Sequence, residues 1–315
     1  MKISRQKAVW LVLLLTLGAA PAAVGRDEIL TSVFSMDYNG YARAKLADGS
    51  FKPETYAFGE GQYSNGRMRD PSIEGFTFME LARLLAPYLA RQKYLPTHSP
   101  DETDLLIVVH WGTTIPFDDG SYRNALDGLS TAMSAVQNLG PPPGSPMGGG
   151  PMGGGSMTGG PMAGLRSQLD GELTSALMMV EMENRQRDMA NARNAALLGY
   201  LPDMNRLGDL RWFGGFRSRY DDLVADVEED RYFVILAAYD FHIAWKEKKR
   251  KLLWITRVSI TTRRNRFDEQ VGAMIQSASR YFGRDSDGLQ RLNVPAGKVE
   301  IGQPKVIEVL PSDGK

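Results

Sequence analysis

The sequence of 315 residues contains no cysteine. This absence excludes disulfide bonds, thiolate catalysis, c-type haem attachment and a lipid-modified cysteine at a processed amino terminus. An exported protein without cross-links must be stabilised by its hydrophobic core. Histidine is scarce as well, with three residues, so few imidazole groups are available for metal binding or acid–base chemistry.

Sequence motifs with a known catalytic geometry are also missing. There is no Gly-x-Ser-x-Gly elbow, no His-Glu-x-x-His pair, no phosphate loop and no dinucleotide fingerprint. The sequence therefore predicts no cofactor and defines no active site, and we expect a non-catalytic protein.

The first 25 residues predict a secretory signal peptide. Lys2, Arg5 and Lys7 precede an apolar core at 8–17, and small residues follow it. We expect cleavage near Ala22 to Gly25 and a periplasmic or extracellular location. The apolar core is roughly half the length of the ~20-residue span that a membrane helix needs. No later segment is long and apolar enough to cross a membrane, so we expect no transmembrane segment in the mature chain.

The charges of the mature chain nearly balance. Residues 1–25 contain three basic residues and no acidic residue, which leaves 34 basic against 37 acidic groups and a net charge of −3. A chain with this balance has no general attraction to nucleic acid or to an anionic membrane.

Three parts follow the signal peptide: residues 26–117, an insertion at 118–227, and residues 228–315. Within the insertion, residues 140–164 contain eleven glycines, six prolines and four methionines. This composition predicts a disordered linker. Apolar residues recur every three or four positions on both sides of it, which predicts a helical hairpin whose second helix ends at Leu198, before Gly199 and Pro202. We expect this arm to be attached to the sheet core without being part of it.

The two flanking parts predict an α+β fold: a mostly antiparallel sheet with helices on one face, interrupted by the helical insertion. The apolar run at 104–114 is typical of a central strand, and shorter strands are expected at 29–36, 54–58 and 305–310. Helices are expected at 76–94, where Pro87 should kink or end the first part, and at 266–282, with Asn265 as N-cap and Asp268 three residues on.

Residues 231–245 and 252–264 predict a β-hairpin around a basic turn. The expected register places Asp240 opposite Arg257, and it puts two apolar sets on one face. These sets are Phe233, Ile235, Ala237, Tyr239, Phe241 and Ile243 in the first strand, and Trp254, Val258 and Ile260 in the second.

Several short segments carry a resemblance to a known family. They are Glu54-Thr55-Tyr56-Ala57-Phe58, Thr103-Asp104-Leu105-Leu106-Ile107-Val108, Ala238-Tyr239-Asp240-Phe241, Lys251-Leu252-Leu253-Trp254 and Tyr281-Phe282. Over residues 30–114 and 230–282 the chain resembles an uncharacterised family of bacterial envelope domains, many of them lipoproteins. The resemblance implies a small α+β sheet and an envelope location. It implies no activity and no catalytic residues, and the long insertion and the missing lipidated cysteine depart from the family pattern.

One alternative is a metal-dependent or acid–base hydrolase using His110, Asp240 and His242, which are predicted on sheet strands. The competing interpretation is that both histidines are hydrogen-bonded sheet residues. The paired carboxylates at Asp118, Asp119, Asp221 and Asp222 are read as solvated loop acids. The methionines of the linker offer thioether sulfur for Cu(I), but no histidine or cysteine accompanies them. Met178, Met179, Met182 and Met189 are read as helix packing residues.

Two further segments are candidate interaction sites. Trp212, Phe213, Phe216 and Arg217 have the composition of a binding hot spot, or they seat the insertion on the sheet. The basic turn holds Lys246, Lys248, Lys249, Arg250 and Lys251, which is suited to phosphate or lipid headgroups or to a solvated turn. The leading hypothesis is a protein that binds another envelope protein or a cell-surface component through the insertion.

Overall fold

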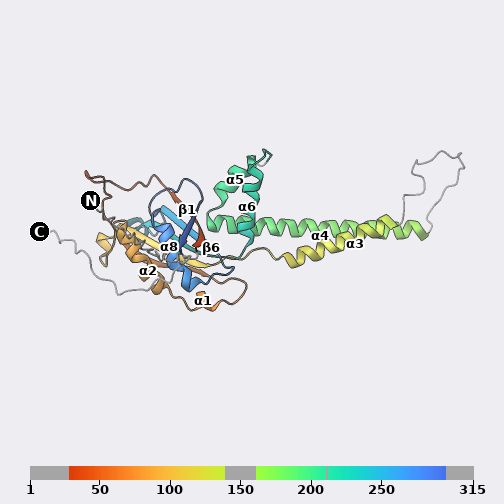
Figure 1. Cartoon of the computed structure of the whole chain (residues 1–315), viewed down its shortest axis with the longest axis horizontal. Helices are drawn as coiled ribbons and strands as arrows, with labels where there is room; N and C mark the ends of the chain where they lie inside the picture. Colours follow the sequence, from red (N-terminus) through yellow and green to blue (C-terminus); the bar gives the residue numbers. More distant parts are fainter. Residues whose placement is uncertain (1–27, 139–160, 211, 296–315) are drawn as a thin grey trace, which may run out of the picture.

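The computed structural model describes residues 28–138, 161–210 and 212–295, which form a sheet domain with a long projecting helical arm (Figure 1). The strands are β1 Glu28–Asp37, β2 Glu54–Ser64, β3 Tyr94–Pro96, β4 Leu105–Thr113, β5 Arg231–Asp240, β6 Leu252–Thr261 and β7 Gln290–Pro295. The helices are α1 Pro71–Glu74, α2 Phe78–Arg91, α3 Asp119–Asn138, α4 Pro161–Leu198, α5 Leu201–Leu210, α6 Phe216–Glu228, α7 Phe241–Lys246 and α8 Phe267–Ser279.

The described strands form one sheet in the order β3-β2-β4-β5-β6-β1-β7. The predicted α+β class is confirmed, but the sheet is mixed. β2 runs parallel to both β3 and β4, and the remaining neighbours are antiparallel. The parallel pairs arise because α2 carries the chain back between β2 and β3, and parallel strands need such a crossover.

The predicted strands at 29–36 and 104–114 correspond to β1 and β4, and the strand predicted at 54–58 continues as β2 to Ser64. Two strands were missed. β3 has only three residues, and β7 is a polar edge strand without a buried alternation. The strand predicted at 305–310 lies outside the described residues.

Helices α2 and α8 cover one face of the sheet and enclose the main core. Leu81, Leu85 and Leu89 of α2 are fully buried, as are Trp254 of β6 and Phe267 of α8. Thr77 begins α2 with a capping box, in which its side chain and that of Glu80 each bind the other's backbone N–H. Pro87 lies inside α2 and does not end it, since packing against the core holds the helix through to Arg91.

The predicted cap of α8 is wrong. Its N-cap residue is Arg266, which makes no side-chain capping bond. The Asn265 side chain turns back to donate to the carbonyl oxygen of Thr261 at 3.0 Å, so it closes the turn after β6 and is not free to cap the helix.

The predicted β5–β6 hairpin is wrong in its turn and in its register. β5 ends at Asp240, whose side chain accepts a hydrogen bond from the Ile243 backbone and caps α7. The observed ladder pairs Ala238 with Trp254 and sets Arg257 opposite Ile235, so Asp240 does not face Arg257. β5 is buried on both faces for most of its length. Its continuous apolar run therefore did not indicate which face of β5 lies beside Trp254, Val258 and Ile260 of β6.

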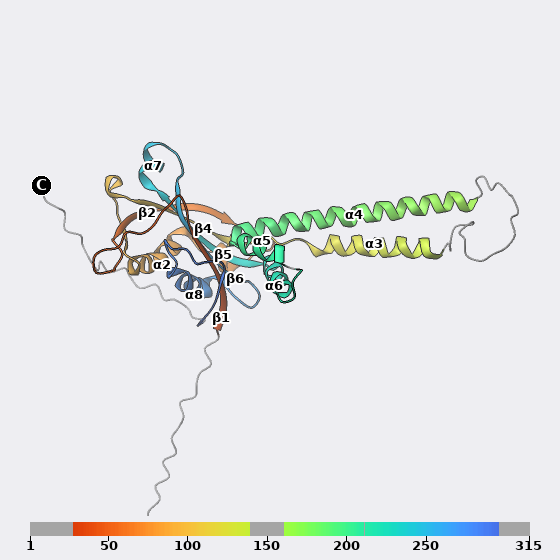
Figure 2. The same ribbon diagram turned by 90° about the horizontal axis from the view of Figure 1, so that it is seen from above.

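The base of the insertion packs on the opposite face of the sheet, in contrast to the expected separation of arm and core. A second buried cluster joins Ala195, Leu198, Tyr200, Leu223 and Val227 to Phe233 and Ile235 of β5. Helices therefore cover both faces of the sheet. Beyond this base, α3 and α4 lie side by side and extend away from the sheet (Figure 2).

The hairpin helices match the prediction at Leu198, where α4 ends. α4 begins at Pro161, so the last four residues of the predicted linker are helical. Residues 140–160 of that linker lie outside the described residues, as does the predicted signal peptide.

Replacing Gly199 with alanine should destabilise the protein by at least about 2 kcal/mol. Gly199 has φ +83, and a Cβ there would lie 2.6 Å from the Phe34 ring, where the end of α4 meets β1. Urea unfolding followed by tryptophan fluorescence measures the loss. The control is Gly128→Ala in α3, where a Cβ meets nothing within 4 Å. Equal stability of the two variants would contradict the close packing of insertion and sheet.

Candidate functional site

The three residues of the hydrolase alternative lie apart. His110 is opposite Ile235 in the β4–β5 ladder, and Asp240 is opposite Leu105, five positions along, or roughly 17 Å. His242 is exposed on α7. Among the described residues, no group of three His, Asp or Glu side chains is placed to hold a metal ion. The geometry therefore gives this alternative no site.

His110 and Asp240 have structural partners instead. His110 Nδ1 accepts a hydrogen bond from the Gln62 backbone N–H at 2.8 Å. Burial, with a smaller contribution from nearby Arg250, lowers the pKa of His110. Asp240 caps α7 and forms an ion pair with Lys251 at 3.9 Å. His110 thus connects β4 to β2, and Asp240 connects the end of β5 to α7.

The free energy of unfolding should fall as the pH drops below about 6.5, the ordinary pKa of histidine in an unfolded chain. The lowered pKa of folded His110 means that the unfolded chain takes up the proton first, which favours unfolding. His110→Asn keeps an acceptor for Gln62 but cannot titrate, so its stability should fall less between pH 7 and pH 5. Urea unfolding at both pH values measures this, with His242→Asn at an exposed position as control. An identical pH dependence of wild type and His110→Asn would contradict the assignment.

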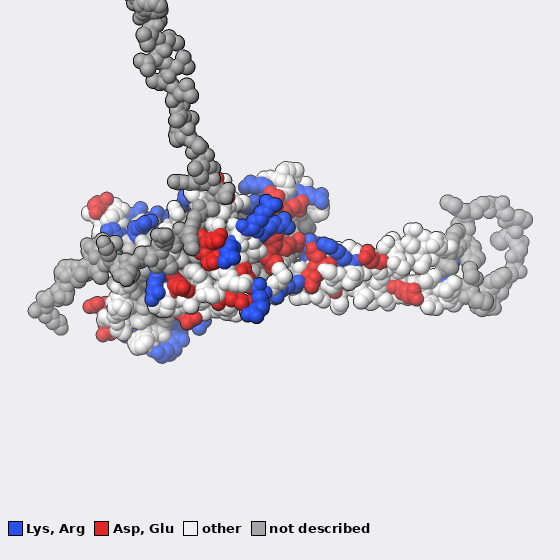
Figure 3. Space-filling model, turned by 60° about the horizontal axis from the view of Figure 1, so that its bottom comes forward, with Lys and Arg blue, Asp and Glu red and all other residues white. Residues whose placement is uncertain are grey.

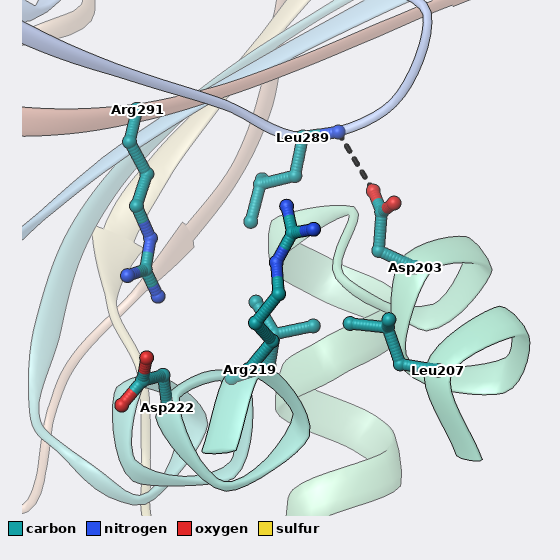
Figure 4. A pocket seen from close by; sticks show the side chains of 7 residues that line it. Asp203, Leu207, Arg219, Asp222, Leu289 and Arg291 are labelled. Atoms are coloured by element: carbon teal, nitrogen blue, oxygen red, sulfur yellow. Dashed lines mark hydrogen bonds between the residues drawn. The ribbon is translucent and has the colours of Figure 1, made fainter. Parts of the chain in front are cut away.

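A pocket of about 230 Å³ lies between α5, α6 and the segment leading into β7 (Figure 4). Leu207, Leu223 and Leu289 form its apolar wall, and its charged residues are Asp203, Arg219, Asp222 and Arg291. Asp203 accepts a hydrogen bond from the Leu289 backbone and pairs with Arg206. Arg291 is paired with Asp226 at 2.7 Å. Two of these four charged residues, Asp203 and Arg291, therefore connect the insertion to β7 and to the segment before it.

Asp226 is the centre of this joint. Its carboxylate pairs with Arg291 at 2.7 Å and with buried Arg231 at 3.4 Å. It also accepts a hydrogen bond from the Tyr200 hydroxyl at 3.0 Å. These groups come from α6, β7, β5 and the α4–α5 connection, so one carboxylate links the insertion to two strands.

Replacing Asp226 with alanine should cost about 3–5 kcal/mol, because it leaves the buried charge of Arg231 without its carboxylate. Thermal or urea unfolding of the purified protein measures the change. Asp222→Ala is the matched control on the same helix: its side chain is exposed, and its loss should change stability by less than about 0.5 kcal/mol. A similar loss of stability in both variants would contradict the role of the Asp226–Arg231 ion pair.

The aromatic segment does not seat the insertion on the sheet. Trp212, at 82% exposure, Phe213 and Phe216 lie on the surface at the α5–α6 connection. Arg217 lies 4.0 Å from Asp221 one helical turn on. Other residues form the buried joint, as described above. The segment stays a predicted interaction site.

The basic segment 246–251 is the end of α7 followed by a loop, and not a tight hairpin turn. Lys249 pairs with Glu247, and Lys251 pairs with Asp240. The Lys248 ammonium lies 5.0 Å from the centre of the Trp245 ring. Nearby acids and an aromatic ring thus already engage three of the five basic side chains.

The arm carries the largest unexplained surface. One row of α4 residues, at least partly buried and spaced three or four apart, faces α3 and α6, and we call it the inner seam. It consists of Arg166, Leu169, Leu173, Ala176, Val180, Glu183, Arg187, Ala190 and Asn194. Ser121 of α3 donates to Glu183 at 2.9 Å, and Arg187 of α4 donates to Glu228 of α6 at 2.7 Å. This spacing is that of a two-helix coiled coil.

A second row on α4 lies two residues after each inner position from Leu169 to Asn194, about 200° around the helix and therefore on the opposite side. We call it the outer seam, and all eight of its residues are exposed. They are Gly171, Ser175, Met178, Met182, Arg185, Met189, Ala192 and Ala196. The interpretation of the methionines as packing residues is wrong within this chain: Met178 is 68% exposed, Met182 51% and Met189 66%.

The outer seam contains a single charged residue, Arg185. In Figure 3 most of the arm's surface is neither acidic nor basic, whereas charged side chains gather on the sheet domain. On α3, Leu126 and Met133 are also exposed. A group of exposed methionines and leucines on one element is typical of a place where proteins or membranes bind.

No protein-family model matches the sequence, and no curated protein matches it. Within the described residues, none of the helices has both the length and the apolar character needed to cross a membrane.

Sequence reasoning located the hairpin but missed its outer surface. The signal was present, because a row of small residues and methionines repeats every three or four positions from Gly171 to Ala196. It was hidden because α4 has apolar residues on two sides, and a search for one stripe finds only the inner seam.

Proposed function

We propose that this chain is an exported envelope protein that binds another protein through the outer seam of its helical arm. The observation that carries the proposal is the row of exposed methionines on a helix whose other side is already occupied by α3. Water-exposed methionines gain free energy when a partner covers them, about 25 cal/mol for each Å² of apolar surface.

The geometry favours an α-helical partner. Alternating steps of three and four residues present a straight row of knobs that fits between the side chains of another helix. Methionine side chains are flexible and adapt to the surface they meet. The small residues at both ends of the row allow a helix to approach closely.

The envelope location is part of the same proposal. It rests on the predicted signal peptide of residues 1–25 and on the resemblance to bacterial envelope domains. A binding role also fits a fold in which two of the hydrolase candidates, His110 and Asp240, make structural hydrogen bonds.

A photo-reactive amino acid placed at Met178, Met182 or Met189 of the full chain should give one discrete cross-linked product in the cells that make the protein. The same substitution at Met68 and Met79, which are exposed on the sheet domain, is the matched control and should give none. Cell fractionation should recover the product from the envelope. The absence of a product from the arm positions, or equal amounts of product from the arm and the sheet domain, would contradict the proposal.

A further inference from the structure

The residues of the outer seam are arranged nearly symmetrically about its centre, and this arrangement indicates which partner it fits. Read from either end, its residues fall into four pairs about a point between Glu183 and Asn184, and three of these pairs are alike. The outermost pairs contain only small residues: Gly171 with Ala196, and Ser175 with Ala192. Next come Met178 with Met189, and Met182 with Arg185 at the centre. Reversing the direction of the helix therefore presents nearly the same surface.

A surface that matches its own reverse satisfies the condition for a two-fold symmetric interface, in which the same patch of both subunits meets. We propose that the outer seam of α4 pairs antiparallel with the outer seam of a second copy of this chain, with the two-fold axis between residues 183 and 184. The inference rests on the proposed function, since it identifies the protein that the arm binds.

The structure leaves this face open along its whole length. The eight seam residues are exposed, and a Cβ added to Gly171 would meet nothing within 4 Å. α3 and α6 bind the other side of α4, through Glu183, Arg187 and Asn191. A second α4 thus adds to the arm without displacing any described contact, and gives the helix order α3, α4, α4, α3.

The central arginine disfavours a parallel pair in register more than an antiparallel pair, in which the two Arg185 residues are offset by three residues, or about 4.5 Å, along the axis. A parallel pair in register would place Arg185 of each copy against the other, with two like charges at the contact. The antiparallel pair places Arg185 against Met182 of the second copy. Arg185 Nε also keeps its 3.1 Å bond to Glu181 on its own helix, so its charge is balanced at the edge of the seam.

Charges beside the seam agree with this direction at its ends. Antiparallel alignment brings exposed Glu172 near Arg193 of the second copy, twice by symmetry. The same alignment brings Glu181 near Asp188 of the second copy, but Glu181 is already paired with Arg185. Opposite charges at the flanks of a helix pair fix its direction and register.

The size of the contact predicts a reversible dimer. The seam from Gly171 to Ala196 is about 38 Å long at 1.5 Å per residue, and a helix is about 10 Å wide, so the two faces together cover roughly 800 Å². This is below the roughly 1,000 Å² expected of a stable specific interface, so we expect a weak association that depends on concentration. Measurements therefore have to extend to high protein concentration.

The absence of cysteine makes the register directly testable with single cysteines. In the proposed dimer Met178 of one copy lies opposite Met189 of the other, whereas the two copies of Met178 lie 11 residues, or about 16 Å, apart along the axis. A short bismaleimide should therefore cross-link a mixture of purified Met178→Cys and Met189→Cys chains, and neither variant alone. Ser130→Cys, exposed on α3, is the matched control and should give no product with either.

Each outcome of this experiment decides the proposal. Product in the mixture alone supports the antiparallel dimer. Product from each variant alone indicates a parallel pair and overturns it, and no product at any concentration overturns it as well. In the last case an adduct of the arm with a different protein in cells would leave the proposed function standing and refute only the second copy as partner.

Sedimentation equilibrium supplies an independent measurement on the unmodified protein. The apparent mass should rise from one chain toward two with concentration, and Met178→Lys with Met189→Lys should keep the protein monomeric. The pair Met68→Lys with Met79→Lys, on the sheet domain, should dimerise as wild type does. These substitutions are all at exposed positions, so an unchanged circular dichroism spectrum verifies the fold. A wild type that remains monomeric contradicts the proposal.

Discussion

Arg231 is the buried charge that the joint between sheet and arm has to satisfy. Its side chain is 5% exposed, at the first residue of the central strand β5. The guanidinium donates to Ser259 of β6 at 3.2 Å and to Ser32 of β1 at 3.3 Å, and it pairs with Asp226 of α6. A buried guanidinium without a carboxylate is strongly unfavourable. Three strands and the insertion therefore have to come together at one place.

This requirement explains why the insertion is both a part of the core and a projecting element. The last residues of α4, together with α5 and α6, are anchored where Arg231 is satisfied, and their apolar side chains cover Phe233 and Ile235. Farther out, in the part of the arm that the structure describes, α3 and α4 pack on each other. Two helices alone cannot bury apolar residues on two sides of one of them, so the distal arm is left with an unsatisfied surface.

How much of this was available from the sequence depends on the kind of pattern. Isolated periodic segments were predicted well: β1, β4 and the end of α4 at Leu198, where Gly199 allows a positive φ. The β5–β6 pairing was not, because Asp240 ends the strand by capping a helix, which local apolar alternation does not reveal. His110 lies on strand β4 as predicted, but His242 lies on helix α7 and not on a strand. The separation of His110 from Asp240 depends on register, which the sequence did not specify. The outer seam was readable, but only after the inner seam had been assigned to α3.

The position of β1 has a consequence for how the chain folds. The first described strand lies between β6 and β7, and Thr31 donates a hydrogen bond to Leu292 across 261 residues of sequence. The sheet therefore has a high contact order, which makes folding slow because long loops must close before these contacts form. Until residues 252–295 emerge, β1 has neither of its neighbours, and the apolar edge of β5 is open. A chain built this way leaves these unpaired strand edges exposed for a period between synthesis and folding.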